Sequence, residues 1–146
     1  MGCDIHGWVE IRPYEWNKDY WKSMINISYL ERNYLIFARI FGVRNHFEDL
    51  EITPIAANRG LPSTDKYDDD ENNNEPRNLD RKECGVDGHS ESWISLKEFY
   101  LHLDEIFEPY NVYATFSKWW ALYQMMRILG DLYGLDNVRL VVWFDN

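Results

Sequence analysis

Two short motifs in the chain pair an aspartate with a histidine two residues later: Asp4 with His6, and Asp87 with His89. Carboxylate oxygens and imidazole nitrogens bind divalent metals such as Zn, Mn or Mg, and a metal held in this way activates water. Asp145 would be a fifth ligand. The competing interpretation is that each histidine is a hydrogen-bonded structural residue and each aspartate belongs to a turn or a helix cap.

The only two cysteines of the chain, Cys3 and Cys84, each lie close to one of these motifs. A mixed thiolate and imidazole zinc site is therefore an alternative, although the spacing is unlike that of a zinc finger. A buried, reduced thiol is the simpler interpretation of Cys3, which falls on the apolar face of a predicted strand. Two cysteines are far from a disulfide framework, which favours a reducing cytoplasm.

Arginine and asparagine are neighbours at three places and make a second candidate site, for an anion. Guanidinium groups bind phosphate or carboxylate in a bidentate manner, and an aromatic ring nearby can stack a base or a sugar. The alternative is that the arginines pair with acidic side chains at the surface and the aromatic rings belong to the core. The candidate ligand-binding residues are Arg32, Asn33, Arg44, Arg59, Ser90 and Trp93.

The net charge of −10 limits the classes of partner. It argues against binding to a nucleic-acid backbone or to an anionic membrane surface, but it allows a small anionic ligand in a local arginine pocket. Nor does any stretch reach the roughly 18 apolar residues of a membrane span. We therefore expect a soluble cytoplasmic protein.

Three segments have the alternation or composition of β-strands. Residues 2–12 alternate apolar and polar side chains, residues 19–25 follow a turn, and residues 138–146 are rich in Val, Leu and Trp. The first two segments predict a hairpin, and the third is free to join it as a further antiparallel strand.

Two registers are compatible with pairing of the first and last strands. A register that opposes Glu10 to Arg139 forms a favourable charge pair and brings Asp145 next to Asp4. A shift by two residues instead opposes His6 to Asp145. In either register Asp4, His6 and Asp145 lie on one face within about 10 Å, and we expect the loop before His89 to carry that residue to the same face.

Helical periodicity with a capping residue at the start predicts three helices, which span 28–42, 95–109 and 117–134, with Thr115 as an alternative cap for the last. The third is apolar on several sides, so we expect it to be buried on most faces. Residues 43–93 have little periodicity and form a long loop region, in which 63–84 is a mobile, acidic segment.

These elements predict a single domain over 1–146 of the α+β class. A small antiparallel sheet, made of the N-terminal hairpin and the C-terminal strand, is packed by about three helices.

Several short motifs of the sequence, spread over nearly its whole length, resemble those of a family of small uncharacterised bacteriophage proteins. The resemblance implies a phage origin and therefore a host-cell cytoplasm, but it carries no mechanism. The motifs are Met1-Gly2-Cys3-Asp4-Ile5-His6, Arg32-Asn33-Tyr34 followed by Phe37-Ala38, Gly42-Val43-Arg44, Arg59-Gly60-Leu61-Pro62, Gly88-His89-Ser90 with Ser92-Trp93, and Trp143-Phe144-Asp145-Asn146.

Three functions follow as hypotheses. The first is a phage accessory protein, with an anti-defence role suggested by phage origin, that binds a nucleotide-derived or other anionic small molecule. The second is a metal-dependent phosphoester hydrolase. The third is host-protein binding or homo-oligomerisation through aromatic side chains exposed on the hairpin, namely Trp16, Tyr20 and Trp21.

Overall fold

The computed structural model describes residues 2–62, 87–108 and 117–146. The predicted acidic segment 63–84, with Cys84, lies outside the described residues. Four strands form one sheet with the order β2-β1-β4-β3, and every neighbouring pair is antiparallel. The strands are β1 (Asp4–Ile11), β2 (Lys22–Asn26), β3 (His89–Ser95) and β4 (Val138–Asp145).

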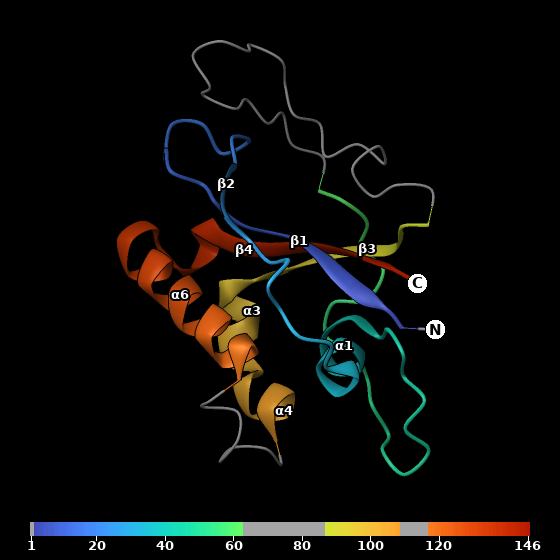
Figure 1. The fold of residues 1–146 in the computed structure, drawn as a ribbon. Helices are drawn as coiled ribbons and strands as arrows, with labels where there is room; N and C mark the ends of the chain where they lie inside the picture. The colour runs from blue at the N-terminus through green and yellow to red at the C-terminus, as the bar shows by residue number, and fades with distance from the viewer. Residues whose placement is uncertain (1, 63–86, 109–116) are drawn as a thin grey trace.

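The described helices lie together on one side of this sheet (Figure 1). They are α1 (Tyr34–Phe41), α3 (Leu96–Leu101), α4 (Leu103–Phe107), α6 (Lys118–Tyr133) and the short 3-10 helix η1 (Leu135–Asn137). A small antiparallel sheet covered by helices is an α+β fold, which confirms the predicted class. None of the helices in the described part of the chain is long and apolar enough to cross a membrane.

The alternation of β1 places its apolar residues against the helices. Ile5, Val9 and Ile11 are buried and pair with Phe144, Leu140 and Val138 of β4, which are buried as well. The helices α1 and α6 pack against these residues and add large side chains to the same hydrophobic core. Among them are Phe37, Phe41, Trp119, Tyr123 and Met126. The core therefore lies between the two central strands and the helices.

Glu10 and Arg139 form a buried ion pair on the opposite face of the sheet. The two residues are directly opposed in the β1–β4 register, which confirms the first of the two registers considered above. Arg139 Nε lies 3.6 Å from Glu10 Oε1, and the guanidinium carbon lies 3.8 Å from the ring centre of Trp21. Burial lowers the pKa of Arg139, and the charge of Glu10 acts in the opposite direction.

The hairpin exposes fewer of its aromatic residues than predicted. Trp16 is 78% exposed, but Tyr20 and Trp21 are buried. Trp21 is the residue that covers Arg139, so the prediction that all three are exposed is wrong for the last two.

The first helix begins later than predicted. Asn33, and not Ser28, is its N-cap, because the Asn33 side chain accepts a hydrogen bond from the backbone N–H of Ile36 at 3.1 Å. The backbone N–H of Ser28 instead donates to the side chain of Asn26, and the carbonyl of Glu31 accepts from the Trp119 indole. Local and tertiary hydrogen bonds thus replace the first predicted turn, while Gly42 ends the helix as predicted.

The predicted long loop contains a strand that the sequence pattern does not reveal. β3 is rich in serine, and only Ser92 and Ile94 are buried along it. Its pairing with β4 is long-range, and such tertiary pairing overrides a weak local preference. The sheet therefore has four strands and not three.

The two later helices also differ from prediction in part. Ser95 caps α3 as predicted, in a capping box with Glu98, but the helix is interrupted at His102 and continues as α4. Ser117 caps α6 as predicted. However, α6 is buried on one side only, because Ile128 and Leu132 are exposed.

Gly7 is expected to be the residue of β1 least tolerant of a side chain. Its φ is +140°, and a Cβ atom there would overlap the backbone carbonyl of Val141 in β4. Gly7→Ala should therefore lower the free energy of unfolding by more than about 4 kcal/mol, measured by urea denaturation.

Gly60 provides the matched control, because its φ is also positive, at +78°, but a Cβ atom added there would meet no other atom within 4 Å. Gly60→Ala should cost only about 1 kcal/mol. Equal losses for the two variants would contradict the close approach of β1 and β4.

Candidate functional site

Polar residues from both ends of the chain meet where β1 begins and β4 ends. Asp4 is directly opposed to Asp145 in the antiparallel register, and the two chain ends lie beside each other next to α1 (Figure 1). Two carboxylates in opposed positions repel each other, so each needs a cationic or hydrogen-bonding partner. The structure supplies a different partner to each.

Asp145 is hydrogen-bonded to His6. His6 Nε2 lies 2.8 Å from Asp145 Oδ2, and because an ionised carboxylate can only accept, Nε2 is the donor. The imidazole also stacks on Trp143, with ring centres 5.8 Å apart, and Trp143 in turn contacts Trp8 at 5.1 Å. The predicted grouping of Asp4, His6 and Asp145 on one face is thus present.

Asp4 is held by Arg32 in a bidentate ion pair. Nε and Nη2 of Arg32 donate to the two carboxylate oxygens at 2.6 and 3.0 Å. Both side chains are about half exposed, at 53% for Arg32 and 50% for Asp4. The hydrogen bonds from Arg32 hold the pKa of Asp4 below its ordinary value, and the positive charges of Arg32 and His6 act in the same direction.

Arg44 lies at the same end of the sheet, on the helix side. Its Nη2 donates to the Asn146 side chain at 3.1 Å, and its guanidinium carbon lies 5.9 Å from the ring centre of Tyr34. The Tyr34 hydroxyl accepts from the backbone N–H of Cys3 at 3.1 Å. Cys3 itself is buried, and burial raises the pKa of its thiol, so it is a structural thiol as its place on the apolar face predicted.

His89 reaches the predicted end of the sheet but the opposite face from His6. It pairs with Phe144, whose ring it stacks at 6.3 Å, and Phe144 belongs to the core on the helix side. Its ring nitrogens lie 2.9 Å from Ser90 Oγ and 3.4 Å from the side-chain oxygen of Asn146. The expectation that His89 shares a face with His6 is therefore wrong, because His89 pairs with Phe144 and His6 pairs with Trp143, and successive residues of β4 point to opposite faces.

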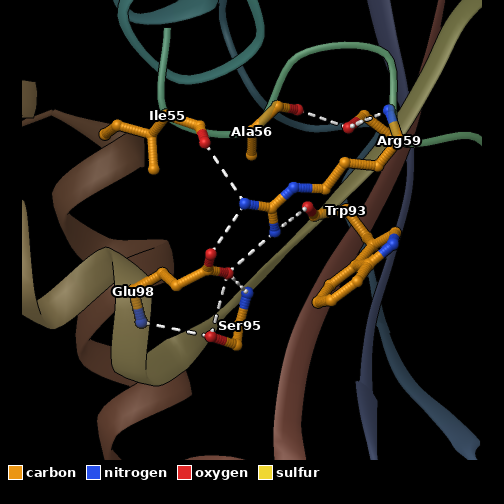
Figure 2. Close-up of polar contacts among 7 residues, drawn as sticks. Ile55, Ala56, Arg59, Trp93, Ser95 and Glu98 are labelled. Carbon is orange, nitrogen blue, oxygen red and sulfur yellow. Dashed lines mark hydrogen bonds and ion pairs between the residues drawn. The ribbon is translucent and has the colours of Figure 1, made fainter.

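Arg59 and Trp93 lie elsewhere and do not join the other arginines. Arg59 donates to both carboxylate oxygens of Glu98, at 2.7 and 2.9 Å, and to the carbonyls of Trp93 and Ile55 (Figure 2). Its guanidinium also lies 4.8 Å from the Trp93 ring centre. This group sits at the Ser95 end of β3, about 20 Å along the strand from His89.

The group around Arg59 has a structural purpose. It fastens the segment after α1 to the junction between β3 and α3, and hydrogen bonds from Arg59 lower the pKa of Glu98. Ser92 contributes from the same strand, since its hydroxyl donates to the Ala56 carbonyl and accepts from the Arg59 backbone N–H. Asn33 is likewise occupied, as the cap of α1.

The predicted metal ligands do not assemble into one centre. Over residues 2–62, 87–108 and 117–146, no group of three or more His, Cys, Asp or Glu side chains is arranged to hold a metal ion. Asp87 is exposed, and the remaining four, Asp4, His6, His89 and Asp145, are engaged in the contacts described above. Metal binding stays a prediction that this geometry does not support.

Comparison of the chain with protein-family models, with curated proteins and with solved structures found no match.

The Asp4 carboxylate provides a direct probe of the half-exposed ion pair. Because the pKa of Asp4 is lowered, the ion pair is complete at neutral pH and is lost as the pH falls through that lowered pKa. Arg32→Gln removes both hydrogen bonds and should raise the pKa of Asp4 toward its ordinary range. An NMR titration of the Asp4 side-chain carbon measures this change.

Arg127→Gln is the control, since Arg127 is an exposed arginine on α6. It should leave the titration of Asp4 unchanged. An Asp4 midpoint that Arg32→Gln does not move would show that the bidentate pair does not exist in solution.

Proposed function

We propose that the chain binds a small anionic molecule at the polar end of the sheet, with Arg32 as the principal anion-binding group. The observation that carries this proposal is the Arg32–Asp4 pair, which is bidentate and half exposed on both sides. Exposed ion pairs contribute little to stability, so a ligand anion can replace Asp4 on the guanidinium at small cost. Carboxylate and phosphate groups fit the same bidentate geometry.

The surroundings of Arg32 favour an anion further. His6 lies beside the opposed aspartates and adds a positive charge when it is protonated. Arg44 supplies a second guanidinium at the same end of the sheet but on the helix side, where it bonds to the Asn146 side chain. At this end of the sheet the cationic groups balance the carboxylates of Asp4 and Asp145, so the local charge is less negative than the net charge of −10 of the whole chain. That net charge still disfavours binding to a nucleic-acid backbone.

A nucleotide-derived ligand is the class that the neighbouring aromatic rings favour. His6, Trp143 and Trp8 form a connected row of rings on the face that also carries Asp4. Trp143 is buried, but His6 and Trp8 are partly exposed, so a ligand with a flat base and a phosphate group can stack on one of these two rings while its phosphate binds Arg32. The resemblance to phage proteins supports an accessory role in the host cytoplasm, such as counteracting host defence, for a binder of this kind.

Isothermal titration calorimetry with ADP-ribose, a cyclic dinucleotide and inorganic phosphate tests the proposal. Arg32→Gln should weaken binding of the ligand by about tenfold or more, because charge-assisted bidentate bonds are lost. Asp4→Asn should have the opposite effect and tighten binding, because it removes the carboxylate that competes for the same guanidinium.

The opposite signs expected for these two variants separate ligand binding from general destabilisation of the fold. Arg59→Gln is the matched control, as it also removes a bidentate arginine pair, and it should leave ligand affinity unchanged once its folding is verified by circular dichroism. Absence of binding by all three ligands, or equal losses for the Arg32 and Arg59 variants, would refute the proposed site.

A further inference from the structure

A cavity of about 610 Å³ lies beside Arg12, just after the end of β1. One wall is the connection between β1 and β2, and the other is the segment in which α6 and η1 lead into β4 (Figure 1). Its volume falls within the range of roughly 300–1,000 Å³ that is typical of small-molecule sites. We call it the Arg12 cavity, and it lies about 26 Å along β1 from Asp4.

Arg12 is fixed in position by Asn137, which also lines the cavity. The backbone N–H of Arg12 donates to the Asn137 carbonyl at 2.8 Å, and its Nε donates to the Asn137 side-chain oxygen at the same distance. The Asn137 amide nitrogen donates in turn to the Tyr133 carbonyl at 2.6 Å, which orients the side-chain oxygen toward Arg12. The guanidinium is therefore in place before a ligand arrives, which reduces the entropic cost of binding.

The two terminal nitrogens of Arg12 keep N–H donors for a ligand. Nη1 lies 3.5 Å from the Lys18 carbonyl and Nη2 lies 3.5 Å from the Asp136 carbonyl, which is the long limit of a hydrogen bond. Each nitrogen carries two hydrogens, so donors remain on both. Within residues 2–62, 87–108 and 117–146, no carboxylate forms an ion pair with Arg12. Unlike Arg32, it can therefore accept an anion without losing an acidic partner.

Arg139 increases the need for a negative charge near Arg12. The guanidinium carbons of Arg12 and Arg139 lie 5.3 and 3.8 Å from the ring centre of Trp21, so the two cations share one ring. Burial lowers the pKa of Arg139, and the charge of Arg12 acts in the same direction. Glu10 compensates Arg139. A ligand anion on Arg12 would reduce the remaining repulsion between the two guanidinium groups.

The charged residues of the cavity limit the charge of its ligand. Lys18 adds a second cation to Arg12, but the carboxylates of Glu15 and Asp136 line the same space. These four formal charges cancel, and Lys97 lies 3.8 Å from Asp136 and partly neutralises it. A single negative charge on the ligand fits this balance, whereas a polyanion is repelled by the two carboxylates. A monocarboxylate is therefore favoured over a phosphate group.

Apolar surface on both walls can receive the rest of the ligand. It comes from Tyr14 on the hairpin side and from Leu132 and Tyr133 on the helix side. Tyr14 is held by stacking on Trp16 and Tyr20, with ring centres 5.1 and 5.7 Å apart. Leu132 is exposed, so covering it with a ligand removes apolar area from water.

We propose that the Arg12 cavity binds a small molecule with one carboxylate group and an apolar or aromatic body. The terminal nitrogens of Arg12 hold the carboxylate in bidentate geometry, and Lys18 adds a second favourable charge. The body of the ligand lies between Tyr14 and Leu132. This site is separate from the one proposed at Arg32, both in its place on the sheet and in the anion that it selects.

An NMR titration of the full chain at neutral pH tests the proposal with three probes, namely benzoate, benzamide and inorganic phosphate. Benzoate should shift the Arg12 Nε–H signal and the backbone amide signals of Tyr14 and Leu132 to saturation. Benzamide has the same shape without the charge and should bind at least tenfold more weakly. Phosphate should bind to these residues more weakly than benzoate, because Glu15 and Asp136 repel its second charge.

Three variants separate binding from folding. Arg12→Gln should weaken benzoate binding by about tenfold or more, and Lys18→Gln by about twofold. Glu15→Gln should instead tighten it by about twofold, because it removes a repelling carboxylate. Lys18 and Glu15 are exposed, and circular dichroism checks that each variant is folded. Arg127→Gln, at an exposed arginine of α6 that does not line the cavity, should leave the affinity unchanged.

Several results would overturn the proposal. One is the absence of saturable benzoate shifts at Arg12, Tyr14 and Leu132, and another is equal affinity for benzoate and benzamide. Phosphate that binds these residues as tightly as benzoate would contradict selection of a monoanion. A Glu15→Gln variant that binds benzoate more weakly than the wild type would contradict the charge balance of the cavity.

Discussion

The buried pair of Glu10 and Arg139 fixes the register of β1 on β4, and the rest of the structure depends on that register. Both side chains are almost fully buried and lie opposite each other. Loss of either partner would leave an uncompensated buried charge, at a cost of about 3–5 kcal/mol. A shift of one residue would turn every core residue of β1 toward the opposite face, and a shift of two would separate the charges. The ring of Trp21, from the hairpin, covers the Arg139 guanidinium in a cation–π contact.

The candidate site is a consequence of the same register at the other end of the strands. Six residues before Glu10 in β1, the same register opposes Asp4 to Asp145. Two opposed carboxylates destabilise the sheet unless each has a cationic or hydrogen-bonding partner. Arg32 and His6 provide the compensation, one to each. The cationic groups that make an anion site plausible are therefore present for a structural reason, and their half-exposed position makes them available to a ligand.

The sequence predicted what depends on local periodicity and on charge matching, and it missed what depends on distant partners. The alternation of β1 predicted a central strand, and the charge match of Glu10 with Arg139 pointed to the observed register as one of two. β3 was missed because its serine-rich sequence becomes a strand only beside β4. Arg59 was grouped with the other arginines because its partner, Glu98, is 39 residues away and no local pattern joins the two.

Ligand binding at this end of the sheet requires the guanidinium of Arg32 to exchange its bond to Asp4 for a bond to a ligand anion. The most direct measurement is the ¹H–¹⁵N NMR signal of the Arg32 Nε–H group during a titration with ADP-ribose, with the Arg59 signal as an internal reference. We predict that the Arg32 signal shifts and saturates while the Arg59 signal stays in place, because Arg59 is held by Glu98 and by two backbone carbonyls. An Arg32 signal that does not move while other residues report binding would contradict the account.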